Sequence, residues 1–175
     1  MDIRPINVNH ALMAEYGLSA WHINNLLKLA QYLITLPENY GHFSMGEFFS
    51  RGGGALMLFN ATIMGYDLPA MTTECGTTAC AIGHGPAAGI APGERESWGR
   101  YTSRNFTGYN NDIFDQLFAS RWASADNTPE GAALRIYYFL EHGKDNSVIE
   151  DIITRTKLKR HMQRAYSNFY RGEPV

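Results

Sequence analysis

The residues best suited to chemistry lie in one short stretch, from Glu74 to Pro86. This stretch contains both cysteines of the 175-residue chain, Cys75 and Cys80, together with His84. A thiolate close to a helix N-terminus is a good nucleophile, and a histidine can serve as its base. Cys75, Cys80 and His84 are therefore candidate catalytic residues, although no motif of a particular cysteine-enzyme family supports them.

The same three residues are candidate metal ligands. Cys80 and His84 stand four residues apart and would share one face of a helix. Structural zinc sites usually take four ligands with short paired spacings, and the interval from Cys75 to Cys80 is unusual for such a site. A closed zinc site would also need His22 and His42 from distant parts of the chain.

Two other interpretations of the cysteines need no ligand. A disulfide between Cys75 and Cys80 is allowed by the spacing but opposed by a reducing compartment. Cysteine is also among the residue types most often found buried. We favour reduced cysteines with a structural role, and we expect no cofactor.

The stretch around these residues is expected to form a short helix. Thr77 or Thr78 can cap it, and Gly85-Pro86 would end it after His84. Two helical turns are too few to be stable alone, so the helix must be packed into the core.

The clearest helix in the sequence covers residues 20–35. Ser19 can cap its start, and Leu36-Pro37 ends it. Its apolar residues recur at three- and four-residue intervals, which is typical of one buried face. These residues are Ile23, Leu26, Leu27, Ala30, Leu33 and Ile34.

Three further helices are expected, one ending near Tyr16, one over 112–120 and one over 129–142. Thr128 can cap the last of them, with Pro129 at its first helical position.

These elements predict a mainly α fold, with an α+β fold as the alternative. We expect one compact helical domain over residues 1–175, with at most a small β element and a long central loop. A short strand is expected within 42–49. The apolar run 55–64 favours helix only weakly.

Composition excludes several classes of protein. Hydrophobic residues make up 45% of the chain and charged residues 18%, which is typical of a globular protein. The net charge of −2 gives no overall attraction for nucleic acid or anionic membranes. No apolar run is long enough for a membrane helix, and the first residues lack a signal-peptide pattern. We expect a soluble cytoplasmic protein without a membrane partner.

Residues 87–111 form the predicted central loop, rich in glycine, proline and serine. Aromatic residues alternate there with arginines, and this combination is typical of binding hot spots and stacking platforms. The predicted binding residues are Trp98, Arg100, Tyr101 and Arg104. The alternative is that the aromatic rings tie the loop to the core.

The C-terminal segment at about 147–171 is expected to be helical and basic. Between Arg155 and Arg171 there are six lysines or arginines and no acidic residue. Candidate contacts to nucleic acid or to an acidic partner are Lys157, Lys159, Arg160 and Arg164. A solvated charged face is the more ordinary interpretation.

The order of three motifs resembles a group of small uncharacterised phage and proteobacterial proteins. The shared features are the run Cys-Gly-Thr-x-x-Cys-x-x-Gly-His-x-Pro from Cys75 to Pro86, an upstream helix ending at Leu36-Pro37, and an Asn-Thr-Pro-Glu-Gly-Ala-Ala helix start from Asn127 to Ala133. The likeness covers about residues 20–143 and omits 52–70. It implies a phage or prophage setting and the bacterial host cytoplasm, with no known activity.

Taken together, these features favour a phage-type accessory or inhibitory protein over an enzyme. It would capture a host protein, a nucleic acid or a small nucleotide-like ligand. One alternative is a small cysteine- or metal-dependent enzyme centred on Cys75, Cys80 and His84. Another is a nucleic-acid-binding module that uses the basic C-terminal segment.

Overall fold

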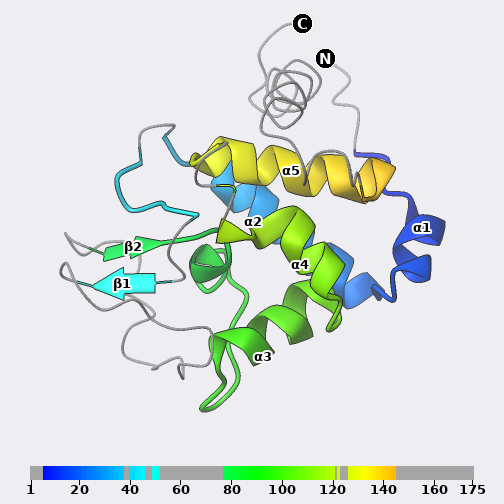
Figure 1. Cartoon of the computed structure of the whole chain (residues 1–175), viewed down its shortest axis with the longest axis horizontal. Coiled ribbons are helices and arrows are strands. Elements are labelled where there is room, and N and C mark those ends of the chain that lie inside the picture. The colour runs from blue at the N-terminus through cyan, green and yellow to red at the C-terminus, as the bar shows by residue number, and fades with distance from the viewer. Residues whose placement is uncertain are drawn as a thin grey trace, which may run out of the picture.

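The computed structural model describes residues 6–37, 40–45, 49–51, 77–120, 122 and 126–144. Over these residues the chain is mainly α-helical, which confirms the predicted fold class (Figure 1). In this described part, no helix is both long and apolar enough to cross a membrane. The expectations for 52–73 and for the C-terminal segment at 147–171 lie outside the described residues.

Helix α5, Pro129–His142, is the most deeply buried element of the fold. Thr128 Oγ1 accepts a hydrogen bond from the Gly131 amide, with Pro129 at the first turn, as the sequence predicted. Between Pro129 and Leu140 only Tyr138 is not buried. Helices α2 and α4 pack against α5, which runs along the top of the helical body in Figure 1.

Helix α2, Ala20–Leu33, packs mainly against α5 and also against a π-helical turn, η4, Ser103–Thr107. Its predicted buried face is correct except at one edge. Leu27 is only partly buried, whereas Leu29 and Asn25 are buried. The buried face is turned toward η4, because Asn25 Nδ2 donates to Asn105 Oδ1 of that turn at 3.2 Å.

The predicted helix ending near Tyr16 and the predicted helix over 112–120 are also present. Helix α1, His10–Glu15, is capped by Asn9, whose Oδ1 accepts from the Leu12 amide. Helix α4, Asn111–Phe118, is capped by Asn110, whose side-chain oxygen accepts from two amides of the first turn. In both helices a local asparagine cap fixes the start.

The prediction of one long loop over residues 87–111 is wrong. Residues in the middle of that segment form helix α3, Trp98–Thr102, which continues directly into η4. Ser97 caps α3, and Gly108, with φ of 57°, ends the π-helical turn. So short a helix depends on tertiary packing, which sequence propensity does not report.

The predicted helix from Thr78 to His84 is also replaced by other structure. Strand β2, Thr77–Ala79, pairs antiparallel with β1, Phe49–Arg51, and a 3-10 turn, η3, Ile82–His84, follows. The Ala79 amide donates to the His42 carbonyl at 2.9 Å, so pairing with residues distant in sequence fixes an extended backbone. The strands confirm that the β element is small, and Figure 1 shows them at the side of the helical body away from α1.

The orientation of α2 can be tested by truncating one leucine within its buried face and one leucine at the rim of that face. Leu26 is 0% exposed, so Leu26→Ala should lower the free energy of unfolding by about 2–5 kcal/mol. Leu27→Ala, at the partly exposed rim, should cost clearly less. Chemical denaturation of both variants measures this, and equal losses would contradict the orientation of α2.

Candidate functional site

The turn that carries Cys80 and His84 packs into the core against aromatic rings. His84 is fully buried, and its ring stacks on Phe43 at a centroid distance of 5.7 Å. Tyr40 and Tyr32 lie 5.8 and 6.1 Å from the same imidazole. The sequence pointed to His84 but gave no sign of this aromatic enclosure, because its members come from separate segments.

The hydrogen bonds of His84 define its tautomer. Nε2 lies 3.3 Å from the His42 carbonyl oxygen, which can only accept, so Nε2 carries the proton. Nδ1 has no hydrogen-bond partner among the residues that the structure describes. Burial lowers the pKa of His84 to about 4, so the ring is neutral at pH 7 and a weak base.

Cys80 is a buried thiol with poor nucleophilic character. Burial raises its pKa to about 11, which outweighs the opposing effect of hydrogen bonds from the Gly83 and Ile82 backbones. A thiol protonated at neutral pH does not supply the thiolate that nucleophilic attack requires. These findings favour the structural interpretation of Cys80, while Cys75 lies outside the described residues.

The metal interpretation also lacks a ligand set. Within the described residues, no three histidine, cysteine or acidic side chains gather where they could hold a metal ion. His22, one of the distant candidates, accepts through Nδ1 from the Ser19 amide at 3.1 Å and belongs to the start of α2. His42 contributes its backbone carbonyl to His84.

The aromatic residues predicted to bind a ligand are part of the core. Trp98 is 1% exposed and Tyr101 is 0% exposed, and their rings meet edge to face at 5.6 Å. The Tyr101 hydroxyl donates to the Ile90 carbonyl at 2.7 Å, close to Gly85, where any side chain would collide with it. This corrects the prediction for both rings, which tie the segment to the core as the alternative interpretation stated.

Arg104 is held by an internal carboxylate. Its Nε and Nη2 each donate to one oxygen of Glu96 at 2.8 Å, and Nη2 also donates to the Ala91 carbonyl at 3.2 Å. Glu96 in turn accepts from the Gly93 amide at 2.7 Å. The hydrogen bonds from Arg104 lower the pKa of Glu96, and those to Glu96 raise the pKa of Arg104. The pair fastens the loop before α3 to η4.

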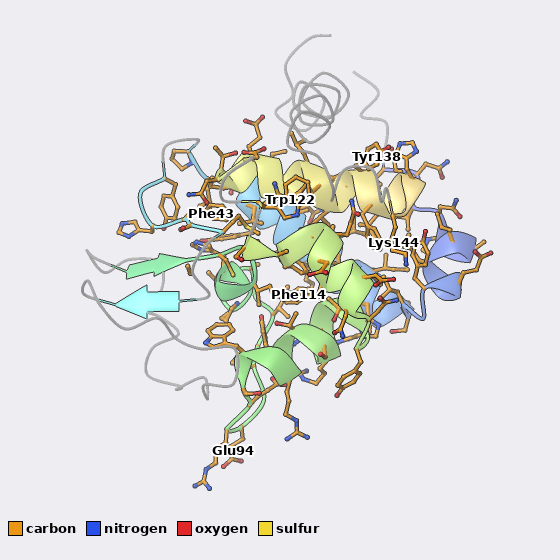
Figure 2. The ribbon with its side chains drawn as sticks, in the orientation of Figure 1. Phe43, Glu94, Phe114, Trp122, Tyr138 and Lys144 are labelled. Atoms are coloured by element: carbon orange, nitrogen blue, oxygen red, sulfur yellow. The ribbon has the colours of Figure 1, made fainter. Side chains whose placement is uncertain are left out.

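Two further arginines of this segment, Arg95 and Arg100, are exposed, and we call this pair the arginine face. The side chains of Arg100 and Arg95 make no hydrogen bond or ion pair with any described residue, although Arg100 lies close enough to Glu96 to lower its pKa. Arg95 has a φ of 51°, a left-handed conformation that is unfavourable for a residue with a side chain. Figure 2 shows the neighbouring Glu94 at the end of a loop that projects away from the helices.

Sequence reasoning identified Arg100 but not Arg95. The left-handed backbone at Arg95 depends on how the loop closes through Glu96, and no local sequence signal reports it. The predicted contacts Lys157, Lys159, Arg160 and Arg164 lie outside the described residues.

Comparison with known proteins gives no relative. No protein-family model, curated protein or solved structure matches this chain. Function must therefore be argued from the arrangement of the residues themselves.

The buried His84 predicts a specific dependence of stability on pH. Its pKa is lowered from 6.5 to about 4 on folding, so the unfolded chain binds the proton more readily in that range. The stabilising contribution is complete above pH 6.5 and is lost as the pH falls toward 4. Between pH 6.5 and 5 the loss from this group should be about 2 kcal/mol.

Chemical denaturation at several pH values measures this contribution. The variant His84→Phe keeps an aromatic ring and should show a flatter dependence, whereas His10→Gln, at an exposed histidine, should match the wild type. An unchanged slope in His84→Phe would show that His84 is not the group responsible.

Proposed function

We propose that this protein is a binding protein that captures an acidic partner protein through the arginine face. The observation that carries the proposal is the pair of exposed guanidinium groups, Arg95 and Arg100, on a braced segment. Neither is neutralised by a hydrogen bond or ion pair within the described residues. Guanidinium groups match carboxylates in charge and in planar geometry.

The segment below the arginine face is well suited to presenting these groups. Trp98 and Tyr101 anchor α3 in the core, and the pair formed by Glu96 and Arg104 closes the loop before it. A surface that is ordered before binding loses less conformational entropy when the partner arrives. A segment held in place in this way is better suited to be a contact surface than a flexible connection.

The local charges favour a protein partner over a nucleic acid. Glu94 is exposed beside Arg95, so the surface is of mixed sign and would repel part of a continuous phosphate backbone. A protein surface can match such a pattern with both signs of charge. A host protein as the partner, in a phage-infected cell, remains the expectation from the motif resemblance.

The enzymatic alternative receives less support from the same structure. Cys80 is a buried thiol with a raised pKa, and His84 is a buried neutral ring with a lowered one. A thiol with a raised pKa is poorly suited to nucleophilic attack at neutral pH, and an imidazole with a lowered pKa is poorly suited to acid–base catalysis there.

The arginine face can be tested with a double variant and with a control that removes a positive charge elsewhere. Affinity capture from bacterial host cells would identify the partner, and calorimetry would then measure its affinity. Arg95→Ala with Arg100→Ala should weaken binding roughly 10- to 100-fold, because arginines are frequent hot spots. The melting temperature should stay nearly unchanged, since neither side chain is buried.

Lys28→Ala provides the control, because it removes an exposed positive charge from α2 instead. It should bind as the wild type does. Equal affinity of the double variant and the wild type would contradict the proposal. Tight binding of a single-stranded oligonucleotide, retained by the double variant, would favour the nucleic-acid alternative.

A further inference from the structure

Helix α5 carries a charged side chain inside the protein. Arg135 is only 2% exposed, and its guanidinium carbon lies 4.2 Å from the centroid of the Trp122 ring. Its Nη1 donates to the Asp126 carbonyl at 3.5 Å, which is long for a hydrogen bond. Figure 2 shows Trp122 beside α4 and α5.

The other edge of this guanidinium has no acceptor from the protein. Neither Nε nor Nη2 of Arg135 finds a hydrogen-bond partner among the described residues, and both atoms are buried. Leaving such donors unpaired in the interior is costly, and more so for a charged group. The Nε–H and Nη2–H groups on this edge of Arg135 therefore lack the oxygen acceptors that buried donors need.

Arg104 shows within the same molecule what this edge binds. Its Nε and Nη2, the same two atoms, each donate to one oxygen of the Glu96 carboxylate at 2.8 Å. A planar group with two oxygens satisfies both donors at once. The matching edge of Arg135 is thus chemically suited to a second group of this kind.

The buried carboxylate of Asp126 accepts a hydrogen bond from another side chain. Asp126 Oδ1 accepts from Thr128 Oγ1 at 2.6 Å, and the carboxyl group packs on Gly131, where any side chain would overlap it. Asp126 still acts on Arg135 through its charge, which opposes the lowering of the Arg135 pKa by burial to about 10. Arg135 is therefore positively charged at neutral pH.

A buried neutral polar residue also lies beside the Trp122 ring. Gln116 is buried on α4, and its backbone carbonyl accepts from Trp122 Nε1 at 2.9 Å. Its side-chain oxygen Oε1 has no hydrogen-bond partner among the described residues. An acceptor of this type suits a protonated oxygen, such as the hydroxyl of a hydrogen phosphate or of a hydroxy acid.

We propose that the Nε and Nη2 edge of Arg135 binds a small oxyanion, a phosphate or a carboxylate group, in the interior of the fold. The ligand must be small, because the surface of a macromolecule cannot reach a guanidinium that is 2% exposed. The site is separate from the arginine face, whose guanidinium groups are exposed, and neither proposal depends on the other.

A titration of the full chain with simple anions tests the site. After dialysis into chloride buffer, inorganic phosphate and acetate are added in separate series at constant ionic strength. The bound anion should raise the melting temperature in a saturable way, by roughly 5 °C at a hundredfold excess over its dissociation constant. The series with the tighter response identifies the preferred oxyanion.

Arg135→Gln should abolish the response, whereas Lys28→Ala, which removes an exposed positive charge from α2, should retain it. Because Arg135→Gln alters a buried charge and can impair folding, the wild type is also labelled with [15N]arginine. The Nε–H resonance of Arg135, assigned through its contacts with Trp122, should shift with the same dissociation constant. Neither anion moving this resonance, or Arg135→Gln keeping the thermal response, would overturn the proposal.

Discussion

The structure depends on the burial of α5 along almost its whole length. A helix with no exposed face cannot be stable alone, and it must be covered by neighbours on every side. Helices α2 and α4 both pack against it. The burial extends to polar residues, since Glu130 and Arg135 are covered along with the apolar ones. The core therefore contains charge, and that charge has to be compensated inside the protein.

The arginines of the fold differ in how their positive charge is compensated. Arg104 has a complete set of acceptors and uses them to close a loop. Arg135 has an aromatic ring on one face and one long hydrogen bond, with two donors left over. Arg95 and Arg100 are solvated instead. These three settings suggest three roles for one residue type: structural bracing, internal anion binding and recognition of a partner.

The sequence predicted those parts of the fold that local chemistry determines. The Thr128 cap with Pro129 after it placed the start of α5, and the predicted bounds of α1 and α4 are within a few residues of those observed. The hydrophobic period of α2 gave most of its buried face. These signals act within one or two turns, so they are readable without knowledge of the partners.

The predictions were wrong where contacts between segments distant in the sequence determine the local structure. Strand β2 is extended because Ala79 bonds to residues near His42, although its local sequence favours a helix cap. Helix α3 forms in a glycine-rich segment because Trp98 and Tyr101 are buried. For the same reason composition could not tell core rings from a binding platform. The altered pKa values of Cys80 and His84 likewise result from tertiary enclosure, which no spacing in the sequence reports.

The central position of α5 can be measured by hydrogen–deuterium exchange of the backbone amides. If α5 is the innermost element, its amides from Ala133 to Leu140 should exchange slowest in the molecule. They should open together with those of α2 and only by global unfolding. Exchange in α5 that is as fast as in the peripheral helix α1 would contradict this account, because it would place the helix at the surface.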